Sequence, residues 1–270
     1  MKCIKFSKLV TALVVATTFG VFGVNKLSAA PLDTPNVKIL GLAPNNVLVP
    51  LESRRTIQVT GVDGNLQGID FRPANGKLYG VTDTDKIYII NPDTGAATFV
   101  QTLSTSFDGG FQSGFDFNPV PDRLRIVGSN DQNLRTNVDT GAVTVDKPLA
   151  YASGDPNFGK NPNITANAYT NSRAGATSTQ LYAIDYDLDT LVLQDPPNDG
   201  NLKTVGSLGI NFAPIGGFDI YTDAKGTNTA FAVSGANLYT INLSTGAATK
   251  VSDRVREDLI GIAATASNKR

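Results

Sequence analysis

The chain carries two short motifs that return along its length. The first combines glycine, an apolar residue, aspartate and a second apolar or aromatic residue, and it stands at residues 68–71 (GIDF), 114–117 (GFDF) and 217–220 (GFDI). The second begins with asparagine and ends with Thr-Gly-Ala, and it stands at residues 91–96, 137–142 and 242–247. Self-similarity with a period of about 20 to 50 residues is typical of repeat architectures.

Each repeat has the pattern of four short strands. In the clearest one, β-branched, aromatic and other apolar residues concentrate in four segments, separated by turns rich in Pro, Asn, Asp and Gly. These segments are residues 66–71, 77–81, 86–90 and 96–103. No segment after the first thirty residues keeps a helical apolar period. The sequence therefore predicts an all-β protein.

The spacing of the repeats and the two ends of the chain predict a closed ring. Segments equivalent to 66–71 recur every 44 to 52 residues, which suits a four-stranded propeller blade. Residues 258–265 resemble a first strand without successors, and residues 37–62 resemble strands two to four without a first strand. We therefore expect a five-bladed β-propeller whose C-terminal strand pairs with the N-terminal blade. The predicted blades are 37–62 with 258–265, 66–103, 113–147, 164–208 and 215–252. A β-sandwich with internal repeats is the alternative, but it does not explain the complementary ends.

The first thirty residues have the layout of a secretory signal peptide. A basic start is followed by the apolar segment 9–24 and by small residues at 28–30. The apolar segment is shorter than the ~20 residues of a membrane-spanning helix. We expect residues 1–30 to be removed, leaving a single domain over 31–270 that starts near Ala30 to Leu32, is secreted or periplasmic, and has no membrane span. A retained N-terminal anchor is the alternative.

Composition excludes several classes of function. The chain has no histidine, so it has no Ser-His-Asp triad and no imidazole metal ligand. Its single cysteine, Cys3, lies in the predicted leader, so no disulfide is expected. Removal of the leader lowers the 23 basic residues to 19 against 24 acidic ones, which changes the net charge from −1 to −5. This balance argues against a nucleic-acid partner.

Several of these segments together resemble a known family. They are 68–73 (GIDFRP), 114–119 (GFDFNP), 122–125 (DRLR), 132–135 (QNLR), 168–171 (AYTN), 194–200 (QDPPNDG) and 216–220 (GGFDI). The chain is similar in them to a bacterial secreted family known only as domain of unknown function 4394 (DUF4394), and the likeness covers roughly residues 37–265. The resemblance implies a secreted repeat protein. It brings no established activity, catalytic residue or ligand.

Asp70, Asp116 and Asp219 are the most regular polar residues of the repeats. They lie in first strands, which line the central channel of a propeller. In one interpretation each carboxylate accepts backbone N–H groups from neighbouring segments. In the other, the three carboxylates converge, raise one another's pKa or hold a cation such as Ca²⁺. Ala168 and Ala263 occupy the matching places in the remaining blades.

Arg125 and Arg135 are unusual because they lie in strand-like segments where other blades have apolar or aromatic residues. An arginine in such a place normally has a carboxylate partner, and we expect Asp116 to be the partner of Arg125. Anion binding is the alternative interpretation. Asn133, in the same segment as Arg135, joins this candidate ligand-binding set.

The loops that join strands two and three are expected to share one end of the ring with the connections between blades. This end carries the long connection 146–163, and Gln67, Gln112 and Asn163 are expected at its rim. Long loops on a rigid scaffold commonly bind ligands, so we expect a site here, at the mouth of the channel. Asp185, Asp187 and Asp189 alternate in one of these loops and form a weak candidate calcium site, because the glycine and the final glutamate of a calcium loop are missing.

These observations favour a binding module that does not catalyse a reaction and has no required cofactor. Its partner would be a small molecule, a sugar or a protein, and carboxylates on the loops favour a cation or a hydroxyl-rich ligand over an anion. The alternative is a carboxylate-dependent hydrolase, of lactonase or glycosidase type, acting at the channel mouth. A purely structural role in the cell envelope stays open.

Overall fold

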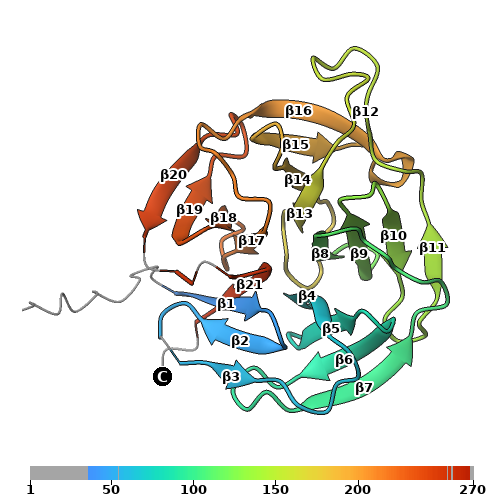
Figure 1. The fold of residues 1–270 in the computed structure, drawn as a ribbon, viewed down its shortest axis with the longest axis vertical. Coiled ribbons are helices and arrows are strands. Elements are labelled where there is room, and N and C mark those ends of the chain that lie inside the picture. Colours follow the sequence, from blue (N-terminus) through green and yellow to red (C-terminus); the bar gives the residue numbers. More distant parts are fainter. Residues whose placement is uncertain (1–35, 54, 254, 257, 268–270) are drawn as a thin grey trace, which may run out of the picture. The chain divides into compact units, whose positions relative to one another are not determined.

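The computed structural model describes residues 36–53, 55–253, 255–256 and 258–267. Five β-sheets stand around a common axis, each with one strand at the centre and the others following outward (Figure 1). This arrangement is a five-bladed β-propeller, so the predicted fold is confirmed. The predicted leader, residues 1–30, lies outside the described residues.

We number the blades around the ring and give their strands from the axis outward. Blade 1 contains β21 (Gly261–Ala266), β1 (Val37–Ala43), β2 (Val47–Pro50) and β3 (Ile57–Gln58). Blade 2 contains β4 (Leu66–Phe71), β5 (Leu78–Thr82), β6 (Lys86–Ile90) and β7 (Ala97–Thr102). Blade 3 contains β8 (Ser113–Asn118), β9 (Arg123–Gly128), β10 (Asn133–Thr136) and β11 (Val143–Val145). Blade 4 contains β13 (Ile164–Tyr169), β14 (Leu181–Asp185), β15 (Thr190–Gln194) and β16 (Asn201–Ser207). Blade 5 contains β17 (Gly216–Thr222), β18 (Asn228–Ser234), β19 (Asn237–Ile241) and β20 (Ala248–Ser252).

Blade 1 closes the ring with strands from both ends of the chain. β21 pairs antiparallel with β1 over six residue pairs, from Val37 opposite Ala266 to Leu42 opposite Gly261. The N–H of Ile260 extends the ladder to the carbonyl of Leu42. The predicted pairing of the C-terminal strand with the N-terminal blade is therefore confirmed, and it covers the edge of β1 that would otherwise be unpaired.

The connection 146–163 contains more regular structure than its sequence indicated. Its residues Ala150–Tyr151 form β12, which pairs in parallel with β16 and adds a fifth strand to blade 4. A 3₁₀ turn, η1 (Pro197–Asp199), lies between β15 and β16. Among the described residues, no helix has the length and apolar character needed to cross a membrane.

The core consists of five apolar clusters, one between each pair of neighbouring blades. Each cluster arises because alternate residues of a strand point to opposite faces of its blade, and each face meets another blade. Between blades 2 and 3, for example, Tyr79 meets Phe117 edge to face with ring centroids 5.4 Å apart. Burial of one such large apolar side chain contributes about 1.5–3 kcal/mol.

The recurring Asn…Thr-Gly-Ala segments form tight turns between the third and fourth strands of blades 2, 3 and 5. The Oδ1 atom of Asn91 accepts the N–H of Asp93, and the positive φ of Gly95, 76°, closes the turn. A Cβ on Gly95 would stand 2.1 Å from the carbonyl oxygen of Gln58 in blade 1. The glycine is therefore required both by its conformation and by close contact with the preceding blade.

Arg72, in the loop after β4, ties blade 2 to blade 3. Its guanidinium donates to both carboxylate oxygens of Asp122 and to both of Asp139, over distances from 2.5 to 2.9 Å. It also donates to the hydroxyl of Tyr79. These two carboxylates raise the pKa of Arg72, so the guanidinium stays charged in its buried position.

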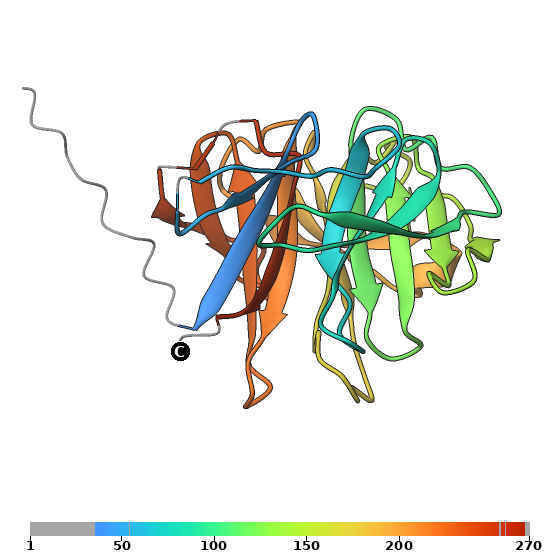
Figure 2. The ribbon, with the colours of Figure 1, turned by 90° about the horizontal axis from the view of Figure 1, so that it is seen from below.

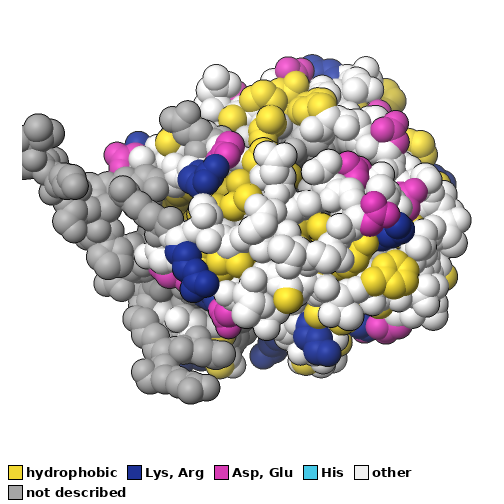
Figure 3. All heavy atoms as spheres, turned by 60° about the horizontal axis from the view of Figure 1, so that its bottom comes forward, with side chains coloured by type: hydrophobic (Ala, Val, Ile, Leu, Met, Phe, Trp, Pro, Cys, Tyr) yellow, Lys and Arg dark blue, Asp and Glu magenta, His cyan; other side chains and the backbone are white. Residues whose placement is uncertain are grey.

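All inner strands begin at one end of the ring, which we call the N-terminal end of the channel. The hairpins between first and second strands project from the opposite, C-terminal end (Figure 2). Residues 170–180 form the connection between β13 and β14 at this end. Charged side chains of both signs are scattered over the face visible in Figure 3, without a continuous basic area.

We predict that the ring depends on β21. A chain stopped after Arg256 would lack Leu259, Ile262 and Ala263, which are buried between blades 5, 1 and 2. Its melting temperature should fall sharply in thermal unfolding followed by circular dichroism, since one inner strand and its ladder are missing. A chain stopped after Ala266 keeps β21 and is the control. Equal stability of the two truncated chains would contradict the closed ring.

Candidate functional site

The glycines of the first motif allow neighbouring inner strands to approach closely. A Cβ added to Gly114 would stand 2.7 Å from the backbone nitrogen of Asn167, in blade 4. A Cβ added to Gly217 would stand 2.6 Å from the backbone nitrogen of Ile262, in blade 1. Because no side chain separates the strands, an aspartate two residues later can reach the backbone of the next blade.

The three motif aspartates accept one backbone N–H group from each of the five inner strands. Asp70 accepts the N–H of Phe71 at 2.6 Å and that of Phe117 at 2.8 Å. Asp116 accepts the N–H of Tyr169 at 3.2 Å. Asp219 accepts the N–H of Ile220 at 2.6 Å and that of Ala264 at 2.5 Å. The interpretation of these residues as backbone acceptors therefore agrees with the structure.

This arrangement explains why Ala168 and Ala263 can interrupt the series. Asp70, Asp116 and Asp219 each reach forward to the next blade, whereas the alanines offer no acceptor to the blade that follows them. Blades 2 and 5 follow the two blades with alanine. There, Asp70 and Asp219 use their second oxygen to accept the N–H of the next residue in their own strand. Three carboxylates are therefore sufficient for five N–H groups, and Asp116 Oδ2 is the one oxygen that accepts none of them.

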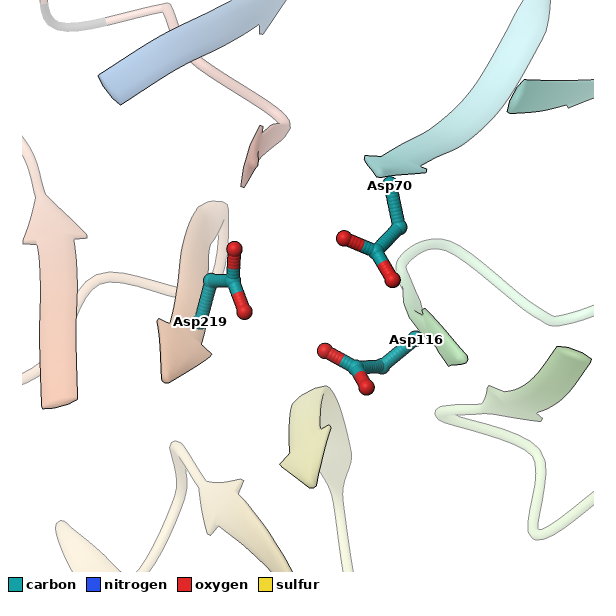
Figure 4. Close-up of side chains that lie close together, drawn as sticks. All are labelled: Asp70, Asp116 and Asp219. Carbon is teal, nitrogen blue, oxygen red and sulfur yellow. The ribbon is translucent and has the colours of Figure 1, made fainter. Parts of the chain in front are cut away.

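The same three side chains converge on the axis (Figure 4). Their exposed fractions are 3 %, 1 % and 3 % for Asp70, Asp116 and Asp219. One oxygen of each can be chosen so that the three lie within 4.8 Å of one another. In the described part of the chain, this is the only group of three or more acidic, cysteine or histidine side chains with that geometry.

Burial without a basic partner changes the acidity of the cluster. Burial and the charge of Asp219 raise the pKa of Asp70 well above its ordinary value. Burial, the charges of Asp70 and Asp219, and a hydrogen bond with Asp219 raise the pKa of Asp116 well above its ordinary value. Burial also raises the pKa of Asp219, to about 6, although its two backbone N–H partners oppose the effect. Without a cation, the cluster therefore retains protons to higher pH than isolated carboxyl groups do.

Arg125 does not pair with Asp116, so this expectation is wrong. The two residues lie directly opposite each other in β9 and β8, but Arg125 donates to Asp146 at 2.6 Å instead. Arg135 donates to both oxygens of Asp146, at 2.7 and 2.9 Å. The carboxylate of Asp116 is engaged at the axis, and Asp146 lies between the two arginines. Both arginines thus belong to a buried ion-pair network.

Other hydrogen bonds of Arg125 and its neighbours show the structural role of the segment Gln194–Gly200. Asn133 and Asn198 accept from Arg125 through their Oδ1 atoms, each at 2.7 Å. The carbonyl of Pro197 accepts from the amide groups of Asn133 and Gln194. This segment therefore joins blade 4 to blade 3 through polar contacts, and the structure leaves Arg125 no exposed surface for an anion.

The structure does not gather Asp185, Asp187 and Asp189 around one point. Asp185 is fully buried and accepts the hydroxyl of Tyr151 and the N–H groups of Asp187 and Leu188. Asp189 accepts the N–H of Phe212. These bonds shape the loop between β14 and β15, and only the carboxylate of Asp187 is exposed.

The channel is crossed at its N-terminal end. Gln112, just before β8, donates its side-chain amide to the carbonyl of Gly216 at 3.1 Å and to that of Ile260 at 2.6 Å. It thereby connects blade 3 with blades 5 and 1 across the axis. At the C-terminal end a hollow of about 350 Å³ remains, lined in part by Phe71, Tyr221 and Ala264, which closely follow the channel aspartates or their blade 1 equivalent, Ala263.

A separate pocket of about 460 Å³ lies between blades 4 and 5 at the N-terminal end. Its wall includes Tyr186, Tyr239, Asp187, Asn211 and Asn237. The side chains of the last three form no hydrogen bond with another described residue, so their polar atoms are available. Sequence patterns indicated the correct end for such loops but not this pocket, because its residues come from two blades.

An exposed aromatic side chain stands beside this pocket. Phe111 is 55 % exposed and meets Tyr186 edge to face, with ring centroids 5.5 Å apart. Ile215, next to the pocket residue Pro214, is 44 % exposed. An apolar rim therefore adjoins a wall with free amide and carboxylate groups, a combination typical of small-molecule sites.

A family model described as a domain of unknown function (DUF4394) matches residues 42–263. No curated protein sequence matches the chain. Among solved structures, a protein of unknown function from Bacteroides thetaiotaomicron VPI-5482 is 20 % identical, with a TM-score of 0.50, over 85 % of this chain and 61 % of its own length. An auxiliary nutrient binding protein from the same organism is 18 % identical, with a TM-score of 0.44, over 71 % and 51 % of the two chains. The first likeness supports the fold alone, and the second supports no conclusion.

We predict that Asp116→Asn makes stability less dependent on pH in protein treated with EDTA. A carboxyl whose pKa is raised on folding binds more protons in the native state, so its stabilising contribution is lost as pH rises from 3.8 through the raised value. Asparagine still accepts the N–H of Tyr169 and carries no charge. Relative to the parent, the variant should gain stability in urea unfolding as the pH rises above the ordinary carboxyl pKa of 3.8. Asp187→Asn is the control, and parallel curves for Asp116→Asn and the parent would contradict the prediction.

We predict that Arg125→Ala destabilises the protein by about 3–5 kcal/mol, because it removes a buried charge from an ion pair and leaves polar partners unsatisfied. Arg125 is 1 % exposed and Asp146 is buried with it. Arg123→Ala, two residues away on the same strand but at a more exposed position, should cost less than about 1 kcal/mol. Chemical denaturation of both variants measures the difference. Equal stabilities would show that the network does not hold blades 3 and 4 together.

Proposed function

We infer that this chain, which belongs to the domain-of-unknown-function family DUF4394, works as an exported binding module that does not catalyse a reaction. The basic start, the apolar segment 9–24 and the small residues at 28–30 support export. The ligand that we propose is a small hydroxyl-rich molecule, such as a mono- or disaccharide, bound in the pocket between blades 4 and 5.

The observation that carries this proposal is the set of free polar groups in that pocket. The side chains of Asp187, Asn211 and Asn237 have no hydrogen-bond partner among the described residues, and they come from two separate loops and the start of β19, which meet at one wall. Amide and carboxylate groups can accept from and donate to adjacent hydroxyls. The rings of Tyr186 and Phe111 offer an apolar surface for the C–H face of a sugar.

The carboxylate-dependent hydrolase is supported less well. Its favourable feature is the axial cluster, because raised carboxyl pKa values are common at catalytic sites. However, Asp116 is only 1 % exposed, and five of the six oxygens in the cluster accept backbone N–H groups. The side chain of Gln112 also crosses the channel at the end with the longer loops. A bound substrate has no described space next to these oxygens at that end.

We predict that a saccharide raises the melting temperature of the processed protein in a thermal-shift screen of common mono- and disaccharides. A ligand that binds only the native state adds about 2.7 kcal/mol at a hundred times its dissociation constant. Asn237→Ala and Tyr186→Ala should weaken the interaction about tenfold or more in calorimetry, since each removes a contact worth about 1–3 kcal/mol.

Asp108→Asn is the control for the pocket variants, because Asp108 is an exposed loop aspartate at the same end of the ring and outside the pocket. Binding that the pocket variants leave unchanged would place the site elsewhere. Turnover of chromogenic glycosides or lactones by the parent protein would favour the hydrolase.

A further inference from the structure

We propose that Asp70, Asp116 and Asp219 hold one calcium ion on the axis of the propeller, with the amide of Asn167 nearby, between β8 and β13. The proposal is independent of the pocket between blades 4 and 5. Its first basis is the convergence of three buried carboxylates from three different blades on one point (Figure 4).

The second basis is an amide that has no partner in the protein. Asn167 is 1 % exposed, and neither its Oδ1 nor its Nδ2 atom forms a hydrogen bond with a described residue. Its Oδ1 atom stands 2.7 Å from the place that a Cβ of Gly114 would take. Gly114 and Asp116 are two residues apart on β8, so their Cβ directions agree. The amide of Asn167 therefore lies between β8 and β13, on the side of β8 toward which Asp116 also points. It is two residues nearer the N-terminal end of the channel than Asp116.

A second buried polar side chain of β13 also has no partner. Thr165, two residues before Asn167, is 1 % exposed, and its hydroxyl forms no hydrogen bond with a described residue. Buried polar groups are nearly always satisfied by protein, water or an ion. The two unsatisfied side chains of β13 thus indicate that water or an ion reaches this part of the ring.

Charge supports a cation in this place. No ion pair in the described part of the chain involves any of the three aspartates, and the nearest charged groups that act on them are one another. A buried carboxylate cluster without a counter-charge is unfavourable, and a divalent ion would supply that charge. The backbone N–H groups use one acceptor position of an oxygen, and each carboxylate oxygen has a second.

The spacing and the type of ligand favour calcium. Calcium binds carboxylate, amide and water oxygens at about 2.3–2.6 Å, so two oxygens of one shell can be about 4.6–5.2 Å apart. The three aspartate oxygens, all within 4.8 Å of one another, meet this condition as they stand. Magnesium demands a nearly ideal octahedron with bonds of about 2.0–2.1 Å and usually keeps several waters, whereas calcium accepts the irregular oxygen geometry of carboxylates that also bind backbone N–H groups.

An ion can approach from the C-terminal end of the channel. The hollow of about 350 Å³ at that end is lined by Phe71 and Ala264, whose N–H groups are bound to Asp70 and Asp219. The carboxylates themselves do not line the hollow, which also contains Arg72 and Arg173, but two of its residues are their direct hydrogen-bond partners. Gln112 crosses the channel at the opposite end, so we place the approach of the ion at the C-terminal end.

The test is a titration of the EDTA-treated protein with calcium chloride, by calorimetry and by thermal unfolding. We expect one calcium ion per chain and a higher melting temperature in calcium. Asp116→Asn, which keeps an acceptor for the one backbone N–H group that Asp116 binds, should weaken binding at least tenfold. Asp219→Asn keeps an acceptor for only one of its two backbone N–H groups and should weaken binding at least as much. Asn167→Ala should weaken it less, because this amide stands one step from the carboxylates.

Asp108→Asn is the matched control and should bind calcium like the parent, since its exposed carboxylate belongs neither to the channel nor to the pocket between blades 4 and 5. Folding of each variant is checked by far-UV circular dichroism, and Asp70→Asn replaces any variant that fails to fold. Absence of heat and of a melting-temperature shift up to about 10 mM calcium, above the range of weak extracellular sites, would overturn the proposal. Binding that persists in both Asp116→Asn and Asp219→Asn would also overturn it.

Discussion

Three buried carboxylates on the axis accept the N–H groups of five inner strands, one from each blade. Inner strands of a propeller cannot pair with one another, so these N–H groups would otherwise face the channel without acceptors. The glycine two residues before each aspartate removes the side chain that would hold the strands apart. The glycine and the aspartate of the Gly-x-Asp motif therefore act together. The glycine lets neighbouring inner strands approach each other, and the aspartate then accepts a backbone N–H group of the next strand.

The ring is secured outside the axis by ion pairs that are distributed unevenly. Arg72 joins blade 2 to blade 3, and Arg125 with Arg135 joins blade 3 to blade 4, in each case through aspartates of the neighbouring loops. Blade 1 has an exposed ion pair with blade 2, between Lys38 and Asp93 at 3.3 Å. It also depends on the ladder between β21 and β1 and on Asp219, which reaches Ala264. Conformational specificity thus comes from polar contacts between blades, and the apolar clusters supply most of the burial.

The two candidate sites differ in whether their side chains also stabilise the fold. The axial carboxylates are part of the framework, so a ligand there must fit groups that already serve the backbone, and a small cation meets this condition. The pocket between blades 4 and 5 uses Asp187, Asn211 and Asn237, whose side chains form no hydrogen bond with another described residue. Such residues can change without loss of the fold, which suits a site that sets ligand specificity.

The sequence by itself determined the fold, because repeat spacing, turn residues and the complementary ends at 37–62 and 258–265 are local or periodic properties. It also marked Asp70, Asp116 and Asp219 as equivalent residues of first strands. Only the tertiary structure decided that their oxygens serve all five blades, since the N–H groups of Phe117, Tyr169 and Ala264 come from other repeats. The partner of Arg125 was also decided by the tertiary structure. Asp116 lies opposite Arg125 in the strand register, but its carboxylate accepts the N–H of Tyr169 in the next blade, and Arg125 donates to Asp146 instead. Contacts between blades join residues far apart in sequence, and no periodicity records them.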